Sequence, residues 1–389
     1  MPNPIQQRII SLSRGTLELT YQTKADYQLD DLLGFAERIN PKRAFLFVSK
    51  VLGRHIPVAP SQIRQAFRQL AEQIPDGLPE PILVFGMAET AVGLSAGVHQ
   101  ILQQRYPNAI LLNSTRHAQD GELLATFSED HSHASQHLIY QSDNPLIKEQ
   151  ILSAKTLIMV DDEASTGKTC QNLVNALIQA GLNQLQQVHL ATLVDWSLGQ
   201  VGKNPFKNQT FNRHHLLSGQ WTWTDKPHDK TIQMPNVATT KAGSQPLLPT
   251  GNWGRKPTLN SSEFLPNLLE NLYKKLENFD KSQLKNVLVL GSNEFVWLPF
   301  LLAERLANDW QINVKFSALT RSPIVIDNQT AIKSVLSFTD NYGLGMTNFV
   351  YNVEPDAWDL IVLCIETPSD SVDKIWQDLV EQGKVLVLD

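Results

Sequence analysis

The chain contains little cysteine and no long apolar run. Cys170 and Cys364 are the only two cysteines among 389 residues, and they lie far apart in the sequence. This usage argues against a disulfide framework and is typical of a reducing compartment. No uncharged apolar stretch is long enough to span a bilayer, and residues 1–15 lack the apolar core of a signal peptide. We therefore expect a soluble, cytoplasmic protein without a membrane partner.

Neither sign of charge dominates the chain. The 33 Lys and Arg residues against 39 Asp and Glu residues give a formal net charge of -6. This balance gives no broad electrostatic reason to expect a nucleic-acid partner, so small molecules are the expected ligands. At 389 residues the chain is long for one α/β domain and comfortable for two.

Two well-known phosphate-binding patterns are missing. A Walker A loop ending in Gly167-Lys168-Thr169 needs a glycine five residues before Gly167, and Asp162 occupies that position. No Gly-x-Gly-x-x-Gly pattern follows the strand predicted at residues 286–290. These absences exclude a P-loop and argue against a dinucleotide-binding site.

The most informative stretch is residues 157–169, with the sequence LIMVDDEASTGKT. Its apolar start predicts a strand buried on both faces of a parallel sheet, with Asp161 and Asp162 where the strand ends. Ligands of open α/β sheets bind beyond the carboxyl ends of strands. The small and hydroxyl-bearing residues that follow lead into a predicted helix, whose N–H groups and dipole favour a phosphate. Acids followed by such a turn predict a sugar-phosphate site, whereas the alternative is that the acids only cap the helix start.

Two further segments follow predicted strands. Residues 81–93 have the sequence PILVFGMAETAVG, in which a strand ends at Gly86 and a turn of small residues allows close approach of a ligand. Lys50, Arg54 and His55 follow the short apolar run that ends at residue 48. These side chains suit an anionic pocket and a solvated turn about equally.

Residues 113–136 are long and polar for an ordinary connection, which predicts a catalytic lid. The span carries Arg116, and the spacing of His131 and His133 also suggests a zinc site, to which Glu129 or Asp130 would add oxygen ligands. No Cys and His set completes a tetrahedral site, and a lid explains the polarity equally well. Strands predicted at residues 137–140, 156–160 and 187–194 complete the first sheet.

Residues 201–260 are predicted to form an irregular linker, because Asn, Lys, Thr, Gly and Pro dominate them. Trp221, Trp223 and Trp253 either hold this linker against the domains, which we favour, or stack nucleic-acid bases. The stretch GNWGRKP at residues 251–257 is the part expected to contact a ligand.

Residues 261–389 again alternate helices and strands, which predicts a second, Rossmann-like α/β sheet. The segments 291–294 and 320–322 both follow predicted parallel strands, so they should meet at one sheet edge. Ser292, Glu294 and Arg321 are therefore candidates for a second site. Arg321 either clamps a phosphate or carboxylate there or pairs with a structural acid.

The apolar strand, two acids, two variable residues, two hydroxyl residues, Gly, a small residue and Thr resemble the phosphoribosyl-diphosphate signature of type I phosphoribosyltransferases. Lys168 stands where that family usually has glycine, although its backbone N–H can still donate. FLFVSKVLGRHIPV, FGMAETAVGL, EDHSHAS and MVDDEASTGKT together resemble phosphoribosyltransferase-like proteins of tellurite-resistance-type bacterial gene clusters. Thr320-Arg321-Ser322-Pro323 is the sequence for which the TRSP domain, found C-terminal to this class, is named.

The resemblance implies a type I phosphoribosyltransferase-like parallel-sheet domain at residues 1–200 and a TRSP-type α/β domain at residues 261–389. It also implies transfer of a phosphoribosyl group from phosphoribosyl diphosphate to a nitrogen base in a stress or tellurite-resistance-type pathway, with Mg²⁺ present. The acids would hold the ribose hydroxyls and, indirectly, the Mg²⁺.

The residues implied for these roles form three groups. The catalytic group is Asp161, Asp162, Glu89 and Arg116. The 5′-phosphate group is Ala164, Ser165, Thr166, Gly167, Lys168 and Thr169. The diphosphate group is Gly86, Met87, Ala88 and Thr90. Because the first domain would bind phosphoribosyl diphosphate alone, Arg321 is expected to affect turnover and not the affinity for that ligand.

Two alternatives stay open at the level of sequence. A non-catalytic sensor could retain the nucleotide site, and the same site could run the reverse reaction on a nucleoside monophosphate. The acceptor base is not determined by the sequence. The oligomeric state is open as well, and a homodimer is compatible with these features.

Overall fold

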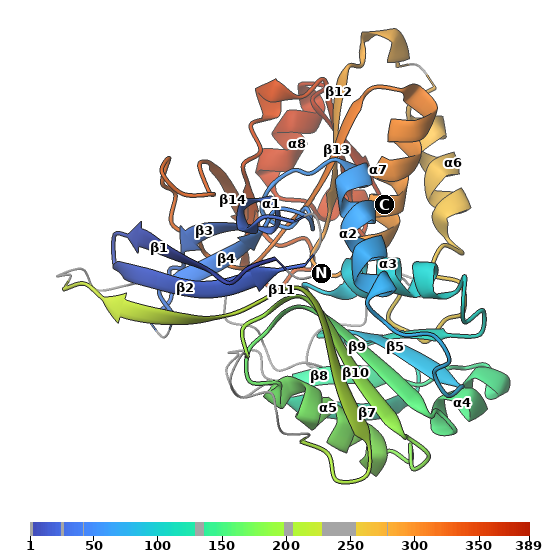
Figure 1. The fold of residues 1–389 in the computed structure, drawn as a ribbon. Helices are drawn as coiled ribbons and strands as arrows, with labels where there is room; N and C mark the ends of the chain where they lie inside the picture. The colour runs from blue at the N-terminus through green and yellow to red at the C-terminus, as the bar shows by residue number, and fades with distance from the viewer. Residues whose placement is uncertain are drawn as a thin grey trace.

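The computed structural model describes residues 3–24, 27–41, 43–128, 136–197, 205–227, 254–277 and 279–389. Within these residues, a seven-stranded sheet and a four-stranded sheet form the centres of two α/β units (Figure 1). The predicted α/β class with parallel sheets is confirmed. Among the described residues, no helix is both long and apolar enough to cross a membrane.

The first sheet has the order β1-β2-β11-β10-β9-β5-β6. Its parallel strands are β5 (Ile82–Gly86), β6 (Ile110–Asn113), β9 (Thr156–Ala164), β10 (Gln187–Asp195) and β11 (Thr210–Asp225). β1 (Gln6–Leu12) and β2 (Gly15–Thr23) extend it as antiparallel strands. Most residues of the inner strands are apolar and buried, because helices cover both faces of a parallel sheet. α2 (Pro60–Glu72) and α3 (Val92–Leu102) pack on one face, and α5 (Lys168–Gln179) packs on the other.

The second sheet is entirely parallel and has the order β13-β12-β16-β17. Its strands are β12 (Asn286–Gly291), β13 (Asn313–Ala318), β16 (Leu360–Cys364) and β17 (Val385–Leu388). α6 (Leu265–Lys275) and α7 (Trp297–Trp310) cover one face. α8 (Lys374–Glu381) and the ribbon of β14 (Val335–Thr339) and β15 (Thr347–Tyr351) cover the other.

Smaller elements surround the two sheets. They are α1 (Leu29–Leu32), the hairpin of β3 (Leu33–Glu37) and β4 (Phe45–Ser49), the ribbon of β7 (Leu123–Ser128) and β8 (Gln136–Tyr140), α4 (Pro145–Leu152), and the 3-10 turns Lys281–Gln283, Pro355–Ala357 and Ser369–Ser371. The β3–β4 hairpin lies near the second unit, since Ala331 donates its N–H to the carbonyl of Phe35.

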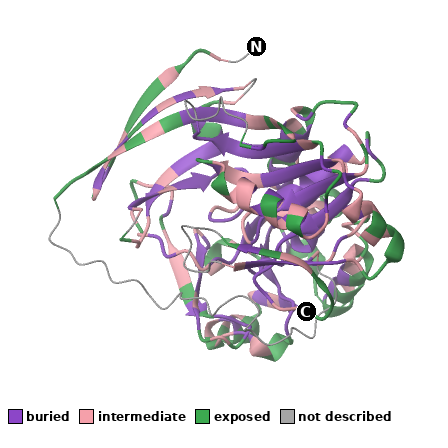
Figure 2. Ribbon diagram, turned by 90° about the horizontal axis from the view of Figure 1, so that it is seen from below, coloured by how far each residue is buried: buried purple, intermediate pink, exposed green. Residues whose placement is uncertain are grey.

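The two units share one apolar core. α2 of the first unit packs against α7 of the second, where the rings of Phe67 and Phe300 are 5.4 Å apart. At the edge of this contact, Arg64 donates to both carboxylate oxygens of Glu304, at 2.8 and 2.7 Å. Figure 2 shows buried residues along the strands and exposed residues on the outer helices. The relative position of the two sheets is therefore set by a packed interface.

Three predictions about elements are wrong. Residues 210–225 are not part of an irregular linker, because they form β11, which pairs with β10 in the first sheet. Trp221 and Trp223 lie on this strand and pack on Phe45, at 4.8 and 5.1 Å between ring centres. The strand at residues 137–140 belongs to the β7–β8 ribbon and not to the central sheet, and β7 itself lies in the span predicted to be irregular.

Several predicted features lie outside the described residues. Residues 129–135 include His131, His133 and the acids considered with them, and they lie near the C-terminal end of the span predicted as a lid. Trp253 and the start of the GNWGRKP stretch are outside as well.

Candidate active site

The order of the first sheet fixes where a ligand should bind. β6 follows β5 in the sequence and lies on one side of it, while β9 lies on the other side. Such a reversal of strand order opens a crevice at the carboxyl ends of the two central strands. Residues 86–90 begin at the last residue of β5, and the acid pair lies in the last part of β9. The two stretches that stand out in the sequence therefore meet at this crevice.

The acid pair lies within β9, beyond the end of β5. β9 continues to Ala164 because it keeps pairing with β10, where Asp161 faces Thr192, whereas β5 ends opposite Val160. The prediction that the strand ends at the acids is therefore wrong by a few residues. The two carboxyl groups remain close enough to interact. Asp161 lines the cavity at the start of α5, and Asp162 lies within the electrostatic reach of Arg54.

The turn after the acids encloses a cavity of about 110 Å³. Its lining includes Asp161, Glu163 and the whole of residues 164–170. Gly167 is the N-cap of α5 at φ 74°, a left-handed conformation that favours glycine. A helix start of this kind attracts anions through its N–H groups and its dipole.

Arg213 of β11 lies beside this turn. A Cβ atom at Gly167 would come within 2.7 Å of the Arg213 guanidinium, which pairs with Asp195 at 3.0 Å. The sequence pattern missed Arg213, since it falls in the segment predicted to be a linker. Its positive charge adds to the anion preference of the turn.

Three consecutive acids crowd the end of β9. Burial and then the neighbouring charge of Glu163 raise the pKa of Asp162. Arg43 compensates Glu163 at 2.9 Å. Carboxylate oxygens are donors that Mg²⁺ prefers, alongside oxygens of substrate phosphates and water. Two carboxylates supply only part of an Mg²⁺ coordination sphere, so substrate phosphates and water would have to supply the rest beside Asp161 and Asp162.

The loop after β5 is held tightly at its base. Only glycine fits at position 86, because a Cβ atom there would lie 2.0 Å from the Ser95 hydroxyl and 2.2 Å from the Asn113 side-chain oxygen. The N–H of Ala88 donates to the Ser114 hydroxyl at 3.0 Å, and the Ala88–Glu89 peptide bond is cis. At its tip, Glu89 pairs with Arg54 at 2.9 Å and with Arg321 of the second unit.

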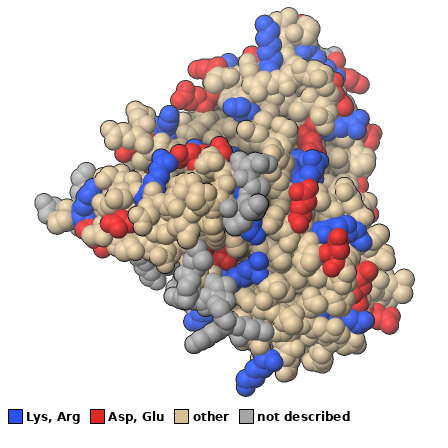
Figure 3. All heavy atoms as spheres, in the orientation of Figure 1, with Lys and Arg blue, Asp and Glu red and all other residues tan. Residues whose placement is uncertain are grey.

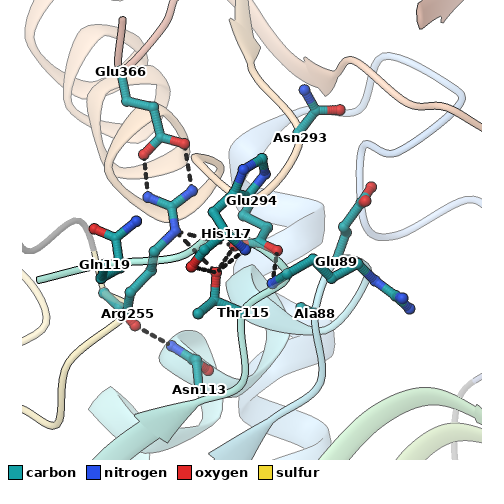
Figure 4. Close-up of polar contacts among 12 residues, drawn as sticks. Ala88, Glu89, Asn113, Thr115, His117, Gln119, Arg255, Asn293, Glu294 and Glu366 are labelled. Atoms are coloured by element: carbon teal, nitrogen blue, oxygen red, sulfur yellow. Dashed lines mark hydrogen bonds and ion pairs between the residues drawn. The ribbon is translucent and has the colours of Figure 1, made fainter. Parts of the chain in front are cut away.

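Beside this loop, buried charged residues join the two units (Figure 4). Glu294 accepts hydrogen bonds from the Thr115 hydroxyl at 2.6 Å and from the Arg116 N–H at 2.8 Å. Arg255 donates to Glu294 at 3.1 Å and makes two hydrogen bonds to Glu366. Glu294, Arg255 and Glu366 are all at most 4% exposed.

The charges in this network are fixed at neutral pH. Burial alone would raise the pKa of Glu294, but the nearby His117 and Arg255, together with its hydrogen bonds, lower it to about 2. Burial opposes the charge of Arg255, whereas Glu366 and then Glu294 raise its pKa above the usual range. Glu294 and Arg255 are therefore both charged at neutral pH.

The network fills the crevice of the second sheet. Strand order reverses there between β12 and β16, so a ligand crevice is expected between the residues that follow these strands. Glu294 follows β12 and Glu366 follows β16, and the guanidinium of Arg255 binds both. Ser292 donates to the Asn341 side-chain oxygen at 3.1 Å. Ser292 and Glu294, two candidates for a second site, are thus bound to other side chains of the protein.

The remaining candidates are placed as follows. Lys50 donates to the Asp30 carbonyl at 2.7 Å and does not join the crevice contacts. His55 is buried and packs near Tyr351 of the second unit, and burial and then the charge of Arg54 lower its pKa to about 3. In the part of the chain that the structure describes, no group of three or more His, Cys, Asp or Glu side chains is arranged to hold a metal ion.

The comparisons agree with this geometry. Residues 32–211 match the family model described as "Phosphoribosyl transferase", so the first unit is a domain of the phosphoribosyltransferase class, which transfers a glycosyl group. Residues 250–382 match the model described as "TRSP domain C terminus to PRTase_2". The chain belongs to the family of phosphoribosyltransferases that carry a C-terminal TRSP domain, as its motifs predicted. A search of curated proteins found no match.

Solved phosphoribosyltransferases match about half of this chain at low identity and low TM-score. Adenine phosphoribosyltransferase from Rhodothermus marinus DSM 4252 is 14% identical, with a TM-score of 0.32 over 49% of this chain and 96% of that chain. The Trypanosoma brucei enzyme in complex with AMP, pyrophosphate and ribose-5-phosphate is 11% identical, with a TM-score of 0.35 over 50% and 82%. Orotate phosphoribosyltransferase from Aeropyrum pernix is 15% identical, with a TM-score of 0.27 over 45% and 77%. No functional conclusion follows from TM-scores below 0.5.

Proposed function

We propose that this phosphoribosyltransferase uses 5-phosphoribosyl 1-diphosphate and transfers the phosphoribosyl group to a nitrogen atom of a base or base-like acceptor. One observation carries the proposal: the acid pair with its phosphate turn and the loop at residues 86–90 meet at the crevice of one sheet. A molecule with a phosphate, two hydroxyls and a diphosphate matches these features in that order. The tellurite-resistance-type pathway is proposed from the sequence resemblance alone.

The roles of the residues follow from their positions. The turn at residues 164–169 would bind the 5′-phosphate at the start of α5, and Arg213 would add positive charge beside it. Asp161 and Asp162 would accept hydrogen bonds from the ribose hydroxyls. The loop at residues 86–90 would meet the diphosphate at its tip, where Glu89 and Thr90 are only partly buried.

The chemistry required of these residues is mainly positioning and charge stabilisation. The bond from the anomeric carbon to the diphosphate oxygen breaks while a bond to the acceptor nitrogen forms, and positive charge develops on the ribose ring. The carboxylates next to the ring favour that charge, and donors at the loop favour the departing diphosphate. A bound Mg²⁺ would neutralise part of the diphosphate charge.

Calorimetric titration tests the proposal. The chain should bind phosphoribosyl diphosphate in the presence of Mg²⁺, and ribose 5-phosphate should compete with it, because both carry the phosphate and the two hydroxyls. Diphosphate release should then depend on one member of a panel of nucleobases. Absence of binding to both sugar phosphates would contradict the proposal.

A further inference from the structure

The carboxyl ends of the two parallel sheets face each other. Glu89 follows β5 of the first sheet and contacts Arg321, which follows β13 of the second. Thr115, which follows β6, contacts Glu294, which follows β12. The crevice of the first sheet therefore lies directly against the second domain.

The loop assigned to the diphosphate carries no cation of its own. Between residues 85 and 95 the only charged side chain is Glu89, which is negative. A diphosphate bears several negative charges, and its recognition usually involves guanidinium or ammonium groups. Cations for this group must therefore come from elsewhere in the chain.

Arg54 and Arg321 are the guanidiniums at this loop. Both pair with Glu89, and their side chains are 8% and 11% exposed. Arg54 also donates to the Asn293 carbonyl at 2.8 Å, and it lies within the electrostatic reach of Asp162. The two cations thus extend from the acid pair to the diphosphate loop, which is the direction in which the substrate would lie.

One carboxylate at the loop is shared by two buried cations. Burial and then the charge of Arg54 lower the pKa of Arg321 to about 10. Burial also lowers the pKa of Arg54 to about 10, against the opposing effect of Asp162 and Glu294. Both groups remain protonated at neutral pH, so an additional anion would be attracted to them.

We propose that Arg321 of the TRSP domain, together with Arg54, forms the subsite for the diphosphate group, so that the second domain completes the transferase site. The inference rests on the proposed function and adds to it the source of positive charge. Glu89 holds the two guanidiniums at the loop in the absence of ligand. The proposal differs from the expectation that Arg321 affects turnover and not the affinity for phosphoribosyl diphosphate.

A docking role of Arg321 makes a different prediction, and Arg64 provides the matched control. Arg64 and Glu304 form another ion pair between the domains, with side chains 17% and 26% exposed, at the contact of α2 with α7. If Arg321 only docks the domains, Arg64→Ala and Arg321→Ala should have similar consequences.

The experiment is calorimetric titration of the full chain with inorganic diphosphate, phosphoribosyl diphosphate and ribose 5-phosphate, each with Mg²⁺. Arg321→Ala should weaken binding of the first two ligands about tenfold or more, because it removes a charge-assisted hydrogen bond. Its affinity for ribose 5-phosphate, which lacks the diphosphate, should stay near that of the parent. Arg321→Lys should lie in between, and Arg64→Ala should bind all three ligands as the parent does.

The contrary results are distinct. Parental affinity of Arg321→Ala for diphosphate would overturn the subsite while leaving the proposed function intact. If Arg64→Ala loses as much affinity for diphosphate as Arg321→Ala does, Arg321 acts through domain docking and the subsite is overturned. The same conclusion follows if Arg321→Ala loses as much affinity for ribose 5-phosphate as for diphosphate. If the parent chain binds none of the three ligands, the proposed function fails and the subsite fails with it.

Discussion

Arg255 shows how much of this molecule depends on a single residue. Its guanidinium lies between Glu294 and Glu366 and forms ion pairs with both. All three side chains are buried in the crevice of the second sheet. A buried ion pair gives little net stability over an apolar replacement, but removal of one partner leaves the other charges uncompensated. Arg255 is therefore expected to be far more sensitive to truncation than any surface cation.

We predict that Arg255→Ala lowers the free energy of unfolding by about 3–5 kcal/mol, because two buried carboxylates lose their partner. The adjacent Lys256 is the control, since its partner Asp143 is 72% exposed. Lys256→Ala should change stability by about 1 kcal/mol or less. Urea unfolding at neutral pH measures both variants. Similar small losses in the two would mean that the network is hydrated or rearranges.

The sequence identified candidate site residues only where they belong to a local sequence pattern. The acid pair, the turn after it and Arg321 all stood out by spacing and residue type. Arg213 and Arg43 did not, because their partners Asp195 and Glu163 lie on other strands. Contacts between residues distant in the chain depend on the packing of the sheets, which no local pattern contains.

At the scale of elements, the packing of α2 on α3 beside the site depends on a small residue. A Cβ atom at Gly97 of α3 would lie 2.0 Å from the Phe67 ring of α2. Phe67 is itself buried and packs on Phe300 of α7 in the second domain. The glycine thus allows three helices to pack closely.

Gly97→Ala should lower the free energy of unfolding by about 1–3 kcal/mol through overpacking. Gly93 of the same helix is the matched control, because its nearest neighbour would lie 3.5 Å away, at Val296. Gly93→Ala should be neutral or stabilising by up to about 1 kcal/mol, since alanine is the better helix former. Thermal unfolding of both proteins measures the difference. Equal stability of the two would contradict the close packing.

Elements with uniform patterns were predictable, and elements defined by their neighbours were not. The apolar runs of β5, β9, β12 and β16 are buried strands, as their composition indicated. β11 has polar residues at both ends and becomes a strand because β10 and β2 lie beside it. The ends of β9 depend in the same way on β10. Pairing with neighbouring strands therefore determined that β11 is a strand and where β9 ends, which composition did not determine.

At the scale of the whole molecule, two sheets with the same reversal of strand order face each other at their carboxyl ends. Basic and acidic side chains are interspersed over the outer face in Figure 3, in keeping with the net charge of -6. The sequence predicted both domains and their order. It did not predict that they share a core, because that depends on the contact of α2 and α3 with α7.

The central claim is that the acid pair recognises a phosphoribosyl group, and one measurement tests it most directly. Calorimetric titration with phosphoribosyl diphosphate and Mg²⁺ compares the parent chain with the Asp161→Asn, Asp162→Asn double variant. Asparagine keeps the shape and an acceptor oxygen, so the melting temperature should stay close to that of the parent. Loss of one charge-assisted contact costs about 1.5–3 kcal/mol, which weakens binding about tenfold or more. The double variant loses two such contacts, so its binding should fall below detection.

The matched control is Asp309→Asn, which removes an exposed carboxylate on α7 that pairs with Arg305 at 2.7 Å. This variant should bind the ligand with the affinity of the parent. The account predicts a folded double variant without detectable binding. A double variant that binds phosphoribosyl diphosphate as tightly as the parent would contradict it, because the acids would then serve only the structure of the strand and the helix start.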